Sequence, residues 1–119
     1  MRRKPGSLVP LEASIIGAAL ELRRLGQDAA HGFLLAKEIQ ARTGARLLTA
    51  YGSLYKALER LERAGLLESF WEDPLIAAEE GRPRRRFYRV TLAGERALAK
   101  HGAERLPMQR SMRPGRVTL

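Results

Sequence analysis

The residues best equipped for chemistry in this sequence are arginines that crowd into one short polar segment. Residues 81–86 read Gly-Arg-Pro-Arg-Arg-Arg and contain no acid. Guanidinium groups match phosphate oxygens with paired hydrogen bonds, and an arginine can also enter a narrow DNA minor groove. The segment therefore predicts contact with a nucleic-acid backbone. Arg82 and Arg84 are the strongest candidates, and Arg85 and Arg86 join them.

A second group of candidates lies on a stretch with helical spacing, residues 50–64. Its leucines and one alanine fall along a single edge, as they do in a helix that packs on a core. Counting 100° per residue from Leu54 places small and polar residues on the opposite edge. The N-terminal part of a recognition helix enters the DNA groove. The candidate DNA-binding residues here are Thr49, Tyr51, Gly52, Ser53, Tyr55 and Lys56.

These candidates differ in the chemistry they offer. Gly52 allows a close approach of the backbone, and Lys56 can donate to guanine or to phosphate. Tyr51 and Tyr55 can donate through their hydroxyls, but they fit equally well as packing residues beside the leucine edge. Lys56 also fits a solvated surface position, and a run of arginines is commonly a solvated charge run.

The elements that must position these side chains follow from apolar spacing and from breakers. We expect helices over 10–25, 32–43, 50–64 and 92–106, strands over 66–72 and 86–90, and a helical turn near 74–80. The order helix, strand, cationic loop, strand predicts a recognition helix followed by a wing. The expected fold is mainly α (α+β), a winged helix-turn-helix with three helices, a two-stranded β-wing and a C-terminal helix.

The chain has 119 residues, which is room for one compact domain. We expect residues 1–8 to form a flexible basic arm and residues 9–91 to form the winged DNA-binding domain. Residues 92–106 should form the C-terminal helix, which Pro107 ends. The basic tail 107–119 lacks periodicity and is expected to be disordered.

The positive charge of the chain is clustered. The net charge is +9, and the segments 2–4, 82–89 and 110–116 hold three, five and three positive charges with no acid. The rest of the chain therefore has a net charge of −2. Charge concentrated in this way indicates a polyanionic partner, and double-stranded DNA is favoured over an anionic membrane.

Other chemistry finds little support in the sequence. There is no cysteine, so disulfides and thiolate metal sites are excluded. His31 lacks the neighbours of a zinc site, and we expect it to hydrogen-bond a neighbouring backbone group or carboxylate at the start of the second helix. No nucleophile elbow, phosphate loop or carboxylate pair appears, so we expect no enzyme, no cofactor and no metal. No apolar run is long enough to span a bilayer, and we expect a cytoplasmic protein.

Trp71 leaves two interpretations open. It could serve as a platform for a small aromatic effector, but a tryptophan beside a wing more often packs in the core or at an interface.

Three local motifs occur in one order: HGFLLA at residues 31–36, YGSLYKAL at 51–58 continued by RLERAGLL at 60–67, and GRPRRRFYRVTLAG at 81–94. Together they resemble the PadR family of winged-helix transcriptional regulators over residues 8–100. The resemblance implies homodimers formed through the C-terminal helix and binding to a two-fold operator, usually as a repressor. It also implies that some members hold phenolic or drug-like ligands near the dimer interface.

Two features depart from the family pattern. Phe33 stands where the family usually has tyrosine. The expected C-terminal helix of about 16 residues, or roughly 24 Å, is short, so the chain resembles the minimal members of the family.

The leading hypothesis is a dimeric, sequence-specific DNA-binding repressor. The alternative is a winged-helix interaction module that docks an acidic partner. An RNA-binding domain is a third and weaker possibility, because no aromatic-rich sheet face is apparent.

Overall fold

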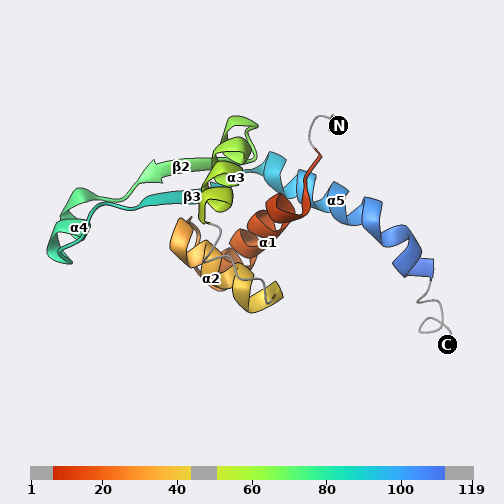
Figure 1. Ribbon diagram of the computed structural model, residues 1–119, viewed down its shortest axis with the longest axis horizontal. Helices are drawn as coiled ribbons and strands as arrows, with labels where there is room; N and C mark the ends of the chain where they lie inside the picture. Colours follow the sequence, from red (N-terminus) through yellow and green to blue (C-terminus); the bar gives the residue numbers. More distant parts are fainter. Residues whose placement is uncertain (1–6, 44–50, 112–119) are drawn as a thin grey trace.

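The computed structural model describes residues 7–43 and 51–111, with side chains for 7–42 and 52–102. Figure 1 shows a helical body from which a β-hairpin and a long helix extend in opposite directions. The elements in chain order are α1 (Pro10–Arg24), β1 (Ala30–His31), α2 (Gly32–Thr43), α3 (Tyr51–Arg63), β2 (Leu67–Trp71), α4 (Pro74–Glu79), β3 (Arg86–Val90) and α5 (Leu92–Ser111). The expected mainly helical α+β winged helix-turn-helix is confirmed.

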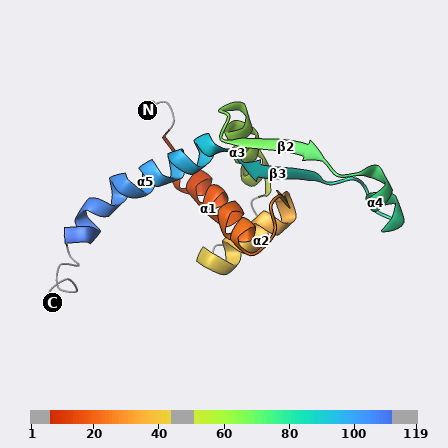
Figure 2. The ribbon, with the colours of Figure 1, turned by 180° about the vertical axis from the view of Figure 1, so that it is seen from behind.

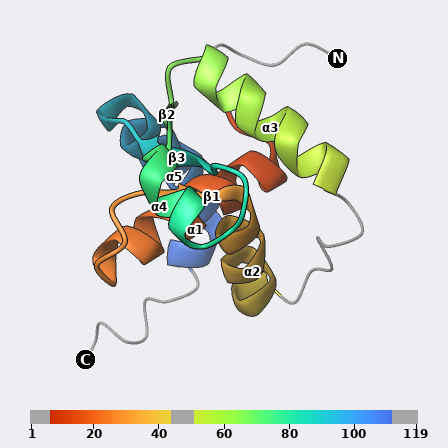
Figure 3. The same cartoon turned by 90° about the vertical axis from the view of Figure 1, so that its left-hand side faces the viewer.

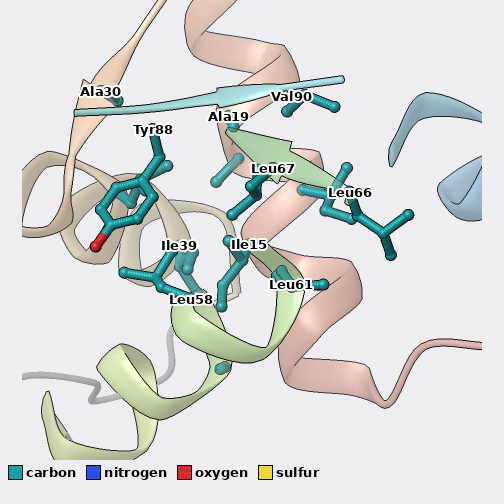
Figure 4. Close-up of a cluster of buried hydrophobic side chains, with 14 of the residues drawn as sticks. Ile15, Ala19, Ala30, Ile39, Leu58, Leu61, Leu66, Leu67, Tyr88 and Val90 are labelled. Carbon is teal, nitrogen blue, oxygen red and sulfur yellow. The ribbon is translucent and has the colours of Figure 1, made fainter. Parts of the chain in front are cut away.

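The core lies where the first three helices meet the inner end of the hairpin, as Figure 4 shows. Its largest fully buried side chains come from all three helices and from β2. They are Ile15, Ile16, Leu35, Ile39, Leu54, Leu58, Leu61 and Leu67. On α2 and α3 these residues recur at a spacing of three or four. On α1 the adjacent Ile15 and Ile16 are followed by the buried Ala19 and Leu22, so each helix contributes one apolar edge. The apolar edges expected for these helices are therefore confirmed.

An ion pair fixes α3 against the start of α1. The Glu12 carboxylate is only 2% exposed, and it accepts a 2.7 Å hydrogen bond from Arg60 Nε on α3. Its other oxygen accepts from the backbone N–H of Val9, which completes the N-terminus of α1. A buried carboxylate needs such partners to offset its lost hydration. The pair therefore sets where α3 sits on the body.

Glycine ends α3 where the sequence indicates. Gly65 has a φ of +80°, a left-handed conformation that favours glycine. The N–H of Leu66 then donates to the carbonyl of Leu61, and the N–H of Gly65 donates to Glu62. This tight stop turns the chain directly into β2.

The sheet has three strands, one more than the sequence predicts. β2 and β3 are antiparallel, with Ser69 opposite Tyr88 and Trp71 opposite Arg86. β1 adds only two residues, pairing Ala30 with Tyr88 on the outer side of β3. A strand of two residues is too short to show an alternating apolar pattern in the sequence. It forms because these residues pair with the free edge of β3 in the folded protein.

The loop between β2 and β3 contains the expected helical turn. Asp73 accepts a hydrogen bond from the N–H of Leu75 at 2.9 Å and so caps α4 at its N-terminus. α4 forms the end of the hairpin farthest from the body, and Figure 3 looks at the molecule from this end.

The C-terminal helix differs from the prediction. α5 has 20 residues and continues through Pro107 to Ser111, so the expected end at Pro107 is wrong and residues 107–111 belong to the helix. A proline inside a helix costs about 3 kcal/mol. Residues 103–106 and 108–110 are mostly strong helix formers, however, and they support the helix on both sides. Residues 112–119 of the tail lie outside the described part.

Leu8 does not belong to the flexible arm expected over residues 1–8. Leu8 is only 8% exposed and belongs to the core, because its apolar side chain packs beside α1. Residues 1–6 lie outside the described part of the chain.

Three contacts fix the first turns of α5. The Thr91 hydroxyl accepts from the N–H of Gly94 at 3.0 Å, so Thr91 caps the N-terminus of α5. A Cβ on Gly94 would lie 2.2 Å from the Leu66 carbonyl oxygen, so only glycine permits this approach. Arg23 on α1 pairs with Glu95 at 2.8 Å. Beyond these contacts α5 leads away from the wing, as Figure 2 shows from behind.

Candidate nucleic-acid interface

The outer edge of α3 presents most of its predicted residues to solvent. Gly52, Ser53 and Lys56 are exposed, whereas the leucine edge is buried. The expected division of this helix into a core edge and an outer edge is therefore confirmed. Thr49 lies outside the described residues, and Tyr51 begins α3 without a described side chain.

Tyr55 has a packed side and an open side. A Cβ at Gly32, the first residue of α2, would lie 2.5 Å from the Tyr55 hydroxyl oxygen, so the ring lies directly over that glycine. The side chain is nevertheless 48% exposed. Tyr55 therefore spaces α3 from α2 and also contributes to the outer surface.

The hairpin is organised around the Glu72 carboxylate, which follows β2. Arg82 donates to its two oxygens at 2.6 and 2.8 Å, in the paired geometry of a guanidinium and a carboxylate. The N–H of Arg85 donates to the same carboxylate at 3.2 Å. Arg82 also donates to Glu80 at 2.8 Å. These bonds close the loop around α4.

The electrostatics of this pair follow from its hydrogen bonds. Donation by Arg82, with help from the N–H of Arg85, lowers the pKa of Glu72 from 4.5 to about 2. Burial opposes this shift but does not reverse it. The same pair raises the pKa of Arg82. Both groups are therefore charged at any physiological pH.

This arrangement changes the role expected for Arg82. Its side chain is only 19% exposed, and two carboxylates occupy its donors. Arg82 therefore stabilises the hairpin through ion pairs within the protein.

Arg84 and Arg86 are held differently, by an aromatic ring. Their guanidinium carbons lie 5.5 and 5.1 Å from the centre of the Trp71 ring, within the range of a cation–π contact. Alternation along the strand predicts that these two arginines point together, and their shared ring confirms it. Trp71 is 52% exposed, so core packing is wrong for it, whereas a position at an interface stays a prediction. Trp71 cannot reach the core because it lies where the hairpin extends beyond the helical body.

The side of the hairpin that carries this cluster faces α3. Trp71 lies opposite Arg86 and shares its face with Ser69 and Tyr88, since alternate residues point the same way. Ser69 donates to Glu62 on α3 at 2.6 Å, and Arg86 lies 3.5 Å from the same carboxylate. We call Trp71 with Arg84, Arg85 and Arg86 the wing root, and residues 72–82 the wing tip.

A hollow of about 300 Å³ lies where the wing root meets the helices. It is lined by His31, Gly32, Phe33, Tyr55 and the three root arginines. The Nδ1 of His31 accepts from the N–H of Leu34 at 3.3 Å, which confirms the expected backbone hydrogen bond at the start of α2. Burial, together with Arg85 and Arg82, lowers the pKa of His31, so its ring is neutral at neutral pH. The positive charge of the hollow therefore comes from the arginines.

The positive charge of Arg89 is balanced by nearby carboxylates. It donates to Glu68, directly across the hairpin, at 3.3 Å, and to Asp28 at 2.9 Å. Two carboxylates thus neutralise the positive charge of Arg89.

Two positioning residues, Glu72 and Trp71, were not among the predicted site residues. Glu72 carries a weak signal, an acid at the end of a strand ahead of an arginine-rich loop. Its partner lies ten positions away, so no helical or strand spacing identifies the pair. Among the described residues no group of three or more His, Asp or Glu could hold a metal ion, and no helix there is long and apolar enough to cross a membrane.

Three helices followed by a β-hairpin place this protein in the winged-helix class. Its third helix has a polar outer edge, and the base of its hairpin is cationic. The model of the transcriptional regulator PadR-like family matches residues 22–100. The chain therefore belongs to the PadR-like family of transcriptional regulators, whose members bind DNA and are not enzymes. No curated protein matches it in sequence.

Two solved structures share the fold. A transcriptional regulator from Clostridium thermocellum superposes with a TM-score of 0.61 at 19% identity, covering 91% of this chain and 92% of that chain. A proposed transcriptional regulator from Thermoplasma acidophilum superposes with a TM-score of 0.58 at 24% identity, covering 90% of this chain and 94% of that chain. At these identities the likeness concerns the fold alone.

Proposed function

We propose that this regulator is a sequence-specific repressor that places α3 in the DNA major groove and the wing root on the adjacent backbone or minor groove. One observation carries the proposal. The hollow is lined by Tyr55 of α3 and by the three root arginines, so the helix and the cationic base of the wing border one surface. A duplex lying on that surface could touch both.

The two parts would perform different tasks. Lys56, Ser53 and Gly52 lie exposed on the outer edge of α3, where a donor and a close backbone approach permit contact with base edges. The root arginines offer guanidinium groups suited to phosphates. The helix would therefore select sequence, and the wing root would supply affinity that does not depend on sequence. Arg82 would act indirectly, by shaping the loop.

The proposal includes a homodimer formed through α5. This helix has 20 residues, about 30 Å, and the part with described side chains packs on the body through contacts such as Arg23 with Glu95. A dimer would present two copies of α3 to half-sites separated by about 34–36 Å, one turn of DNA. Light scattering after size exclusion tests it, and a monomer mass at micromolar concentration would refute it. A small aromatic effector near that interface is part of the same proposal, and a shift in melting temperature with phenolic compounds tests it.

The experiment that tests the central proposal is a DNA titration by fluorescence anisotropy. The protein is titrated with DNA from upstream of its own gene and with a scrambled duplex of equal length and composition, across a salt series. We expect preference for its own DNA by about 10³-fold or more, the lower end of specific over non-specific binding, persisting at physiological salt. A reporter fused to the preferred DNA should be expressed at a lower level when the protein is present.

Equal binding to both duplexes that disappears with salt would refute sequence-specific recognition. Such a result would favour the alternative of an interaction module for an acidic partner. Raised rather than lowered reporter expression would refute only the repressor assignment.

A further inference from the structure

The exposed tryptophan of the wing root lies where the proposed DNA surface continues beyond α3. Trp71 is the only tryptophan in the chain, and about half of its surface is open to solvent. It stands on the α3-facing side of the hairpin, opposite Arg86 in β3. Burial of a tryptophan ring is favourable, so the exposure of Trp71 calls for a physical explanation.

Both guanidinium groups on the ring keep donors available. Arg84 donates Nε to the backbone carbonyl of Glu72 at 3.1 Å and has no carboxylate partner among the described residues. Arg86 donates to Glu62 at 3.5 Å and also interacts with the Tyr88 hydroxyl, so only part of its guanidinium is engaged. A cation–π contact orients a guanidinium through its face and leaves its N–H edges free to bind phosphate. The ring therefore holds two cations in place without consuming their charge.

The opposite face of the same hairpin provides an internal comparison. Phe70 is 39% exposed there, and the Arg89 guanidinium carbon lies 4.9 Å from its ring centre. Arg89, however, is paired with both Asp28 and Glu68. The two faces thus carry the same kind of aromatic–arginine contact, but on the Trp71 face Arg84 has no carboxylate partner among the described residues.

We propose that Trp71 is a DNA-contacting residue, whose ring orders Arg84 and Arg86 for phosphate contact and packs its open surface against the sugar–phosphate backbone. This inference rests on the proposed function, since it requires a duplex on the α3 side of the wing. The ring adds apolar contact to the interface, and it lowers the conformational entropy that the two long side chains lose on binding.

The first test uses the wild-type protein. Because Trp71 is the sole tryptophan, its emission reports this position alone. Bound DNA should protect it from acrylamide, lowering the quenching constant by about twofold or more. An unchanged quenching constant at saturating DNA would overturn the inference. This measurement needs no variant and is independent of any effect of mutation on folding.

The second test compares W71L with F70L, its neighbour on the opposite face. We expect W71L to bind the preferred DNA about tenfold more weakly, and the salt slope to fall by about 1 in magnitude, as when one phosphate contact is lost. W71F should fall between W71L and wild type, and F70L should bind within about twofold of wild type. A normal salt slope in W71L, or equal losses in W71L and F70L, would overturn the inference.

The two proposals fail in distinguishable ways. If the wild-type protein shows no preference for its own DNA, the proposed function fails and this inference fails with it. If the wild type shows the preference and W71L matches it in affinity and slope, only the role of Trp71 fails. Thermal melting of both variants identifies any loss of fold, and in that case the quenching experiment decides.

Discussion

The wing root and the wing tip are adjacent in sequence but opposite in charge. The tip holds four carboxylates and one arginine, so its net charge is −3, and its arginine is paired with Glu72 and Glu80. The root holds three arginines, and in the part of the chain that the structure describes only Arg86 meets a carboxylate, at 3.5 Å. The charge available to a polyanion therefore lies where the hairpin leaves the body, whereas the tip would repel DNA.

This difference shows that clustered arginines are not equally available arginines. An ion pair uses both the charge and the donors of a guanidinium, whereas a stack on an aromatic ring uses neither fully. The tip also exposes Leu75, at 70%, and Ile76, at 46%. Acidic and apolar surface of this kind suits solvent or protein better than a phosphate backbone.

The strongest test of the comparison removes the root charge. Replacing Arg84, Arg85 and Arg86 together with alanine should weaken DNA binding by about 10²–10³-fold and lower the salt slope by up to about 2.7. The physical reason is the loss of three phosphate contacts. Anisotropy across a salt series measures both quantities, and affinity within threefold of wild type would contradict the comparison. Melting temperature serves as the control, because these side chains contribute little to the core.

A double-mutant cycle separates the indirect role of Arg82 from direct contact. R82A leaves the Glu72 carboxylate without its main partner beside the root arginines, and we expect about tenfold weaker DNA binding. Adding E72Q removes that negative charge, so the double variant should recover most of the affinity. If R82A and the double variant bind equally poorly, Arg82 contacts DNA directly and the division between root and tip is wrong.

Acid should loosen the tip before the body unfolds. The folded-state pKa of Glu72 is about 2, below its ordinary 4.5. A lowered carboxyl pKa stabilises the fold above the unfolded value, so this contribution is complete above about pH 4.5 and is lost as pH falls toward 2. Trp71 adjoins Glu72, and its emission should change within this window. The E72Q variant should lack that change, and an identical titration in E72Q would assign the signal elsewhere.

The smallest effect is expected at the tip surface. Glu79 is exposed on α4, and E79K reverses its charge without touching the Glu72 pair. Because we place the tip away from the duplex, DNA affinity should change by less than about threefold at physiological salt, where charges beyond about 8 Å are screened. Anisotropy measures this, with E79Q as a matched control. A gain above tenfold would place the tip against DNA.

Local patterns in the sequence were sufficient for the first three helices and the hairpin. A leucine or alanine every three or four residues identifies the core edge of α3, and Gly65 marks its end. Such signals work because they depend on near neighbours in the chain. The C-terminal helix was predicted too short because Pro107 is a local signal, and the helix formers around it outweigh that signal.

By itself, the sequence determined the class of this protein: the order of elements, the clustered positive charge and three motifs predict a PadR-like winged helix, and the family comparison confirms it. Only the tertiary structure decided which arginines are available. Glu72 reaches Arg82 because the hairpin brings together positions ten residues apart, and Trp71 meets Arg84 and Arg86 because β2 and β3 pair in one register. Charge is a property of composition, but its availability depends on contacts between segments, and no local pattern encodes them.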